Sequence, residues 1–164
     1  MGRMSFGIMS HRMAKRSAGL LMYRRKNGLE VFLVHPGGPF WAKKDLGVWS
    51  IPKGEYVEGE EALRAARREF EEETGFSAEG DFVELGEARQ AGGKIVMVWA
   101  FKGDCDPAKL RSNTFEMEWP PKSGRRAEFP EADKGSWFSM EQAAKYLLAG
   151  QRVFLERLPR AVSG

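Results

Sequence analysis

The sequence contains few of the residues on which several common types of site depend. Cys105 is its only cysteine, which excludes an internal disulfide and a metal site built from several cysteines. The two histidines, His11 and His35, lie near the N-terminus and beside a Pro-Gly loop, so we interpret both as structural or incidental rather than as a general base. Apolar runs such as 95–101 are too short to span a membrane. We therefore expect a chain without a membrane span and a cytoplasmic location.

Acidic residues are absent from the first 29 positions, although arginine and lysine recur there. A basic, acid-free start resembles a transit peptide, but it lacks the apolar segment of a secretory signal. We predict that residues 1–15 form a basic, flexible tail, or that they precede a later start at Met9 or Met13. A length of 164 residues suits one domain with a real core, and we assign that domain to residues 16–160.

Turn residues divide the sequence into short strand-like runs and three helices. Asn27-Gly28 between two such runs is a strong hairpin signal, and Ser139 can cap a helix that Gly150 stops. Strands on both sides of one long helix, followed by terminal helices, predict an α/β fold in which a mixed sheet lies between helices. The predicted strands are 17–25, 29–35, 82–88, 94–102, 114–119 and 136–139, the predicted helices are 60–74, 140–149 and 151–158, and 120–130 is a predicted loop.

The helix predicted at 60–74 carries an unusual charge. Ala62, Leu63, Ala66 and Phe70 recur at helical spacing and predict its buried stripe, with Glu60 and Glu61 in the first turn and Gly75 as a left-handed cap. The last turn should favour cations, because the helix dipole is negative there. It holds carboxylates instead. At about 100° per residue, three of them fall on one face, namely Glu69, Glu72 and Glu73.

Three carboxylates at the negative end of a helix dipole are explained if a cation neutralises them. Hard divalent ions such as Mg²⁺ take carboxylate oxygens as ligands. The alternative is a solvated acidic face, which is common on protein surfaces. The cluster therefore allows two interpretations, and the residues around it decide between them.

The residues around the cluster follow a fixed spacing that begins at Gly54. Five residues separate Gly54 from Glu60, and seven more separate Glu60 from the run that starts at Arg68. The pattern resembles the Nudix box of the Nudix hydrolases at every specified position. Seven of those positions require one particular residue, so a chance match at a given start is of order one in 10⁸. The specified residues are Gly54, Glu60, Arg68, Glu69, Phe70, Glu72, Glu73, Gly75 and Phe76.

The resemblance implies a fold, a cofactor and a set of residue roles. It implies a Nudix-type mixed sheet sandwiched between helices, with the box as a loop–helix–loop, and a requirement for Mg²⁺ or Mn²⁺. Glu69 and Glu73 would be the principal metal ligands, joined by Glu72 and the carbonyl of Gly54. Arg68 would pair with a helix carboxylate and hold it in place. Glu60 would stabilise the loop–helix–loop.

The segment that precedes the box bears on the substrate. Residues 49–54 read Trp-Ser-Ile-Pro-Lys-Gly. This resembles the lead-in of Nudix enzymes that act on diadenosine polyphosphates and diphosphoinositol polyphosphates, and it makes Lys53 and Trp49 candidate substrate-binding residues. A solvated loop lysine is the alternative for Lys53. Residues 89–93 lack both the proline typical of ADP-ribose hydrolases and the tyrosine typical of dinucleoside polyphosphate hydrolases.

A further metal ligand is expected from outside the box, as is common in Nudix enzymes. Along 114–119, apolar residues alternate with Glu116 and Glu118, so one face of this strand is acidic. We take Glu116 as the candidate ligand, with Glu118 and Glu128 as alternatives. A half-buried strand with one wet face explains the same pattern without a metal.

Together these features predict a metal-dependent hydrolase that cleaves a diphosphate linkage in a nucleoside diphosphate derivative. The expected substrate is a small-molecule nucleotide, either a dinucleoside polyphosphate or a nucleoside triphosphate. Bound metal ions would offset the charges of the pyrophosphate and activate a water, so no Ser–His or Cys–His nucleophile is needed. The alternatives are a catalytically weak nucleotide- or RNA-binding protein and an RNA-end pyrophosphohydrolase. The net charge of +3 permits anionic ligands without requiring nucleic acid.

Overall fold

A computed structural model describes residues 15–163 of the chain. The predicted basic tail lies outside these residues except for Lys15, and so does His11. The described elements begin with β1 (Arg16–Arg25) and end with α4 (Arg152–Ala161). None of the helices within 15–163 combines the length and the apolar character needed to cross a membrane.

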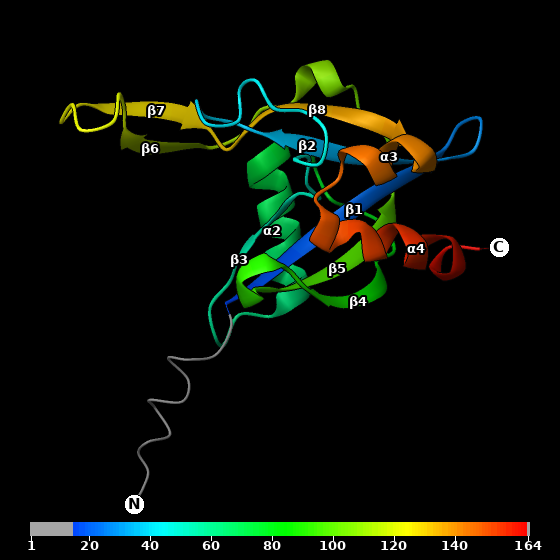
Figure 1. Ribbon diagram of the computed structural model, residues 1–164. Helices are drawn as coiled ribbons and strands as arrows, with labels where there is room; N and C mark the ends of the chain where they lie inside the picture. The colour runs from blue at the N-terminus through cyan, green and yellow to red at the C-terminus, as the bar shows by residue number, and fades with distance from the viewer. Residues whose placement is uncertain (1–14, 164) are drawn as a thin grey trace, which may run out of the picture.

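A six-stranded mixed sheet forms the centre of the fold (Figure 1). Its main path runs β4 (Val83–Arg89), β5 (Ile95–Lys102), β1, β2 (Leu29–Pro36) and β8 (Ala132–Ser139). The pairing of β1 with β5 is parallel, and the other pairings are antiparallel. The short strand β3 (Lys53–Glu55) pairs with the first half of β1, and β2 pairs with the last residues of β1. The α/β fold with a mixed sheet is thus confirmed.

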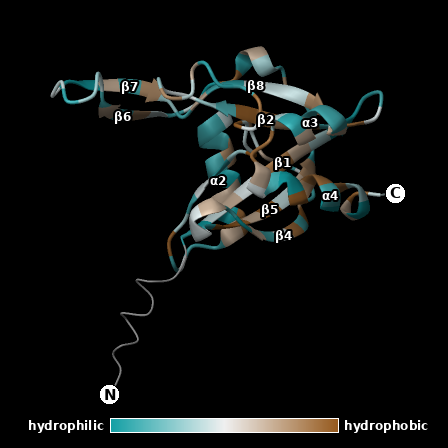
Figure 2. Ribbon diagram, viewed as in Figure 1, coloured by the Kyte–Doolittle hydropathy of each residue, from teal (hydrophilic) through white to brown (hydrophobic). Residues whose placement is uncertain are grey.

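Helices cover both faces of the sheet. On one face α2 (Ala62–Thr74) packs on alternate residues of β1 such as Leu20 and Met22, whereas Leu21 points to the opposite core beneath α4. Both faces are therefore dry, which explains why β1 is buried over consecutive residues. Figure 2 shows the hydrophobic residues gathered on the central strands and the hydrophilic residues on the outer surfaces. The second core is closed by α3 (Met140–Tyr146).

Several boundaries differ from the prediction, and among the strands the largest difference is in β8, which begins at Ala132 rather than at residue 136. The long helix begins at Ala62 rather than at residue 60, so Glu60 is free to pair with Arg68 and Glu61 becomes the N-cap. The helix capped by Ser139 ends at Tyr146, and a 3₁₀ turn (Ala149–Gln151) precedes α4. Further 3₁₀ turns occur at Ala91–Gly93 and Pro107–Lys109.

The prediction of a loop at 120–130 is wrong, because residues 126–130 form a strand. β7 (Arg126–Pro130) pairs with β6 (Thr114–Glu118) in a separate two-stranded ribbon that projects from the body of the molecule (Figure 1). Phe115 lies opposite Phe129, and their rings contact across the two strands. Only Ala127 and Phe129 alternate with polar neighbours in β7, which is too short a pattern to indicate a strand by itself.

Candidate functional site

An open acidic cleft lies where β3 meets the last turns of α2. Its volume is about 440 Å³, within the usual range for sites that bind small molecules. The walls come from β3, from α2 and from two segments distant in the sequence. The lining residues are Lys53, Gly54, Glu55, Glu69, Glu72, Glu73, Asn113, Thr114 and Glu131.

Backbone hydrogen bonds hold the distant segments against the end of α2. Gly75 ends the helix in the left-handed conformation, with φ of 79°. The carbonyls of Thr74 and Glu72, which the helix leaves unpaired, accept bonds from the N–H groups of Arg111 (2.9 Å) and Asn113 (2.8 Å). Asn113 in turn accepts a bond from the Glu131 N–H at 2.8 Å. The helix terminus thus brings Glu131 into the cleft.

Glycine is required at position 54 because the backbone there lies very close to Glu69. A Cβ atom at this position would overlap the carboxylate of Glu69, and the backbone of β3 therefore lies directly against that side chain. The pairing of Gly54 with Ala18 of β1 fixes β3 at this distance from the helix. The Gly54 backbone and the Glu69 carboxylate thus lie against each other in the lining of the cleft.

Arg68 links two of the carboxylates around the cleft. Its guanidinium donates to both oxygens of Glu60 at 3.0 to 3.2 Å and to Glu69 at 2.7 Å. Glu72 lies farther away, at 3.6 Å. A planar guanidinium can hold two carboxylates in fixed directions, which a lysine cannot do. Arg68 therefore orients Glu69 and ties the middle of α2 to Glu60 in the loop that precedes the helix.

The cleft is an unfavourable environment for negative charge. The pKa of Glu73 is raised to about 8, mainly by burial, with the nearby carboxylates of Glu131 and Glu69 adding to the rise and the charge of Lys53 opposing it. Burial also raises the pKa of Glu69, although Arg68 opposes this, and burial lowers the pKa of Lys53. The carboxylates are thus held where water stabilises them poorly, and a bound cation would relieve that cost.

The donor atoms of the cleft suit a hard divalent cation. The carboxylates of Glu69, Glu72, Glu73 and Glu131 and the backbone of Gly54 offer only oxygen, which Mg²⁺ and Mn²⁺ prefer. As the side chains lie, no three acidic, histidine or cysteine groups within 15–163 converge on one point. Glu69 is directed to Arg68, so it would have to turn partly toward the cleft to share an ion.

The two expected substrate-binding residues have different positions. Lys53 lines the cleft and also an adjoining hollow. Trp49 is 5% exposed and belongs to the core, where its ring packs edge-on against His35 and Phe138. Its indole N–H donates to Asp45 at 2.6 Å. Trp49 therefore lies outside the cleft, and the expectation that it meets substrate is not supported by its position.

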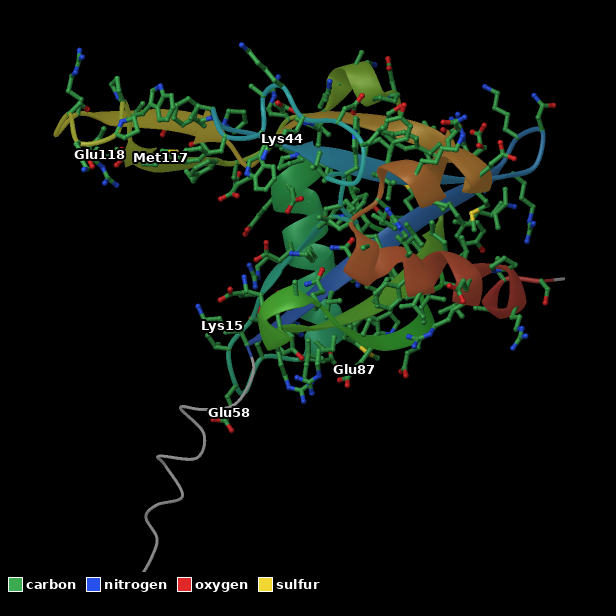
Figure 3. All side chains as sticks on the ribbon, viewed as in Figure 1. Lys15, Lys44, Glu58, Glu87, Met117 and Glu118 are labelled. Atoms are coloured by element: carbon green, nitrogen blue, oxygen red, sulfur yellow. The ribbon has the colours of Figure 1, made fainter. Side chains whose placement is uncertain are left out.

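The strand β6 does not bring its glutamates to the cleft. Glu116 is exposed and pairs with Arg126 at 3.6 Å, with Glu128 opposite it on β7. Glu118 accepts a bond from the Gly124 N–H at the hairpin tip, and Figure 3 shows it far out on the projecting ribbon. The glutamate from outside the box that lines the cleft is Glu131 instead. Nothing in the sequence near Glu131 marks it, because only the backbone bonds to Asn113 and to Gly37 fix its position.

His35 has the structural role that the sequence suggests. It is buried, with Nδ1 2.8 Å from the carboxylate of Asp133 and Nε2 2.6 Å from the carbonyl of Lys44. Both ring nitrogens are therefore occupied. The imidazole connects β8 to the loop that follows β2, and His35 does not line the cleft.

Comparisons with known proteins agree with this architecture. The NUDIX domain family matches residues 13–158. Nudix hydrolase 7 of Arabidopsis thaliana is 43% identical over 74 residues, which are 45% of this chain and 24% of that protein. The RNA pyrophosphohydrolase of Mesorhizobium japonicum is 28% identical over 131 residues, 71% of this chain and 70% of that protein.

A solved structure gives the same fold. The Ap4A hydrolase of C. elegans in a binary complex superposes with a TM-score of 0.61 at 22% identity, covering 90% of this chain and 96% of that one. The family match includes every residue that lines the acidic cleft, from Lys53 to Glu131. The chain belongs to the NUDIX domain family.

Proposed function

We propose that the protein is a metal-dependent hydrolase that cleaves a diphosphate linkage in a nucleoside diphosphate derivative. The observation that supports this most strongly is the cleft that Glu69, Glu72 and Glu73 line together with Gly54 and Lys53. When bound, Mg²⁺ or Mn²⁺ would neutralise the pyrophosphate and lower the pKa of an attacking water. Glu69, Glu73, Glu72, Glu131 and the Gly54 carbonyl would hold the metal. Lys53 would bind a phosphate oxygen, and Arg68 would keep Glu69 in position.

Two substrate classes are consistent with this cleft. Dinucleoside polyphosphates and nucleoside triphosphates are our first proposal, because the cleft joins a partly apolar hollow beside Lys53. An RNA 5′ end is the second. The similarity to an RNA pyrophosphohydrolase favours it, as does the cluster of Lys122, Arg125 and Arg126 at or beside the tip of the ribbon. Phosphate contacts from such a cluster would make RNA binding strongly dependent on salt.

A substrate panel tests the proposal. Diadenosine polyphosphates, nucleoside triphosphates, nucleotide sugars and RNA with a 5′-triphosphate would be incubated with Mg²⁺ or Mn²⁺, and the products identified by mass. We expect release of a nucleoside phosphate from at least one of them, and no release with a chelator present. Hydrolysis in ¹⁸O-labelled water would identify the phosphorus that is attacked. Wild-type protein inactive on the whole panel with either metal would instead favour a binding protein.

Replacing Arg68 by lysine tests whether the guanidinium positions Glu69. Lysine keeps the charge but cannot hold Glu60 and Glu69 at once, so we expect turnover to fall about 10- to 100-fold, the usual effect of losing such a supporting residue. The Mg²⁺ concentration for half-maximal rate should rise as well. Arg64→Lys is the matched control, since Arg64 is an exposed residue of the same helix. Equal effects of the two changes on the Mg²⁺ dependence would contradict this role for Arg68.

A further inference from the structure

A second hollow continues from the acidic cleft. Lys53, Glu73 and Glu131 line both, so a ligand could extend from one into the other without leaving the protein surface. The second hollow differs in character because apolar groups form much of its wall. Its remaining lining residues are Val34, Pro36, Trp41, Val48, Ser50 and Leu148.

Trp41 is the aromatic residue of this wall. Its side chain is 39% exposed, although an indole ring is normally more deeply covered in a folded protein. The ammonium of Lys44 lies over the ring, 5.3 Å from its centroid, but Lys44 does not line the hollow. The cation thus lies over the ring, and the same side chain forms part of the wall of the hollow. An aromatic face that adjoins a phosphate-binding cleft is suited to stack on a nucleobase.

The loop that carries Trp41 is held rigidly. The Lys44 N–H donates to the Trp41 carbonyl at 3.0 Å, and the Lys44 carbonyl lies 2.6 Å from Nε2 of the buried His35. Asp45 accepts the indole N–H of Trp49 at 2.6 Å. The bonds of the Lys44 carbonyl and of Asp45 fix the loop on the core just after Trp41, and the Lys44 N–H ties the Trp41 backbone to that part of the loop. The backbone that carries the ring is therefore in place before a ligand binds, which lowers the entropic cost of ordering this segment on binding.

We propose that Trp41 is the stacking platform for the base of a nucleotide whose phosphates lie in the acidic cleft beside Lys53. This rests on the proposed function and narrows its substrate class. Substrates with a base close to the diphosphate are favoured, and purines most, because their rings cover the indole best. Diphosphoinositol polyphosphates, which have no base, would leave the Trp41 hollow empty.

Binding measured without turnover separates this proposal from the catalytic one. The dissociation constants of ATP and of inorganic triphosphate would be measured by calorimetry in the presence of Ca²⁺, for wild type, Trp41→Ala and Trp41→Phe. The two probes share their phosphates, and only ATP has a base. Leu46→Ala is the matched control, since Leu46 is 67% exposed on the same loop and lies outside the hollow.

We expect Trp41→Ala to weaken ATP binding about 5- to 150-fold, the range that stacking of one base contributes, and to leave inorganic triphosphate unchanged. Trp41→Phe should retain most of the affinity, and Leu46→Ala should match wild type. Equal losses for both probes, or no loss for ATP, would overturn the proposal. Base-dependent binding without hydrolysis would contradict the proposed function and leave the Trp41 subsite standing. Hydrolysis that does not depend on Trp41 would contradict the subsite and leave the proposed function standing.

Discussion

Replacing Glu73 by glutamine is expected to stabilise the metal-free protein at alkaline pH and to abolish most of its turnover. The pKa of Glu73 is raised from 4.5 to about 8, mainly by burial. In the unfolded chain the group titrates near its ordinary value, so the folded state holds the extra proton between these two pKa values. Stability therefore falls as pH rises from about 4.5 to 8, and above 8 the full cost of the buried charge is present.

Glutamine removes that cost while keeping the shape of the side chain and an oxygen for the hydrogen bond from the Lys53 backbone. At pH 9 we expect the metal-free variant to be more stable than wild type, by an amount on the order of a few kcal/mol, because a tenfold change in an acid dissociation constant corresponds to about 1.4 kcal/mol. The lost attraction between Glu73 and Lys53 offsets a part of this gain. At pH 4.5 Glu73 is protonated in the folded wild-type protein, so wild type and the variant should unfold at nearly the same denaturant concentration.

The response to Mg²⁺ is a second test of the Glu73→Gln change. An ion that binds only the folded protein stabilises it by mass action, so the melting temperature of wild type should rise with Mg²⁺. The Glu73→Gln variant should respond much less, and its turnover should fall more than about 100-fold, since a ligand should matter more than the residues that support it. Urea unfolding at pH 4.5, 7 and 9, with and without Mg²⁺, measures both effects.

Glu71→Gln is the matched control for Glu73→Gln. Glu71 lies in the same helical turn, but it is exposed and accepts a bond from the Ala78 N–H outside the cleft. It experiences the same helix dipole without the burial. A Glu73→Gln variant that is less stable than wild type at every pH, with an unchanged response to Mg²⁺, would mean that the acidic helix end is structural.

The parts of the fold that were predictable depend on signals within a few residues of each other. Asn27 and Gly28 both have positive φ, as the predicted hairpin requires, and Tyr23 pairs with Val31 across it. Gly75 and Ser139 act as the predicted caps, the latter by accepting a bond from the Gln142 N–H. The resemblance of residues 54–76 to the Nudix box likewise implied that Gly54 and the helix carboxylates lie together, and both line the cleft. In the hairpin and the caps, the residue type itself determines the local backbone.

The features that escaped prediction depend on contacts between distant segments. Glu131 reaches the cleft because its N–H bonds to Asn113, which is itself bonded to the end of α2. Trp49 is buried because Phe138 of β8 and His35 of β2 pack on its ring. β7 is a strand because β6 pairs with it. Sequence spacing reports what a residue could contact along its own element, and it does not report which other element arrives there.

Replacing Gly54 by alanine is expected to remove most of the activity and to leave the fold intact. The added methyl group would overlap the carboxylate of Glu69, which is the movable end of a flexible side chain. Gly54 is not among the glycines with positive φ, so alanine fits the backbone. Glu69 can therefore swing aside, at the cost of its 2.7 Å ion pair with the partly exposed Arg68. Arg68 keeps its bonds to Glu60.

The expected change in unfolding free energy is thus small, within about 1 kcal/mol, because partly exposed ion pairs contribute little and alanine is favoured over glycine in a strand. Turnover should fall more than about 100-fold, as for removal of a metal ligand, because Glu69 leaves its place against the Gly54 backbone. A double-mutant cycle with Glu69→Ala tests the cause. If alanine at 54 acts by displacing Glu69, the double variant should be no slower than Glu69→Ala alone. Additive losses would mean that the Gly54 backbone contributes independently of Glu69, and full activity in Gly54→Ala would mean that Glu69 is not needed where it lies.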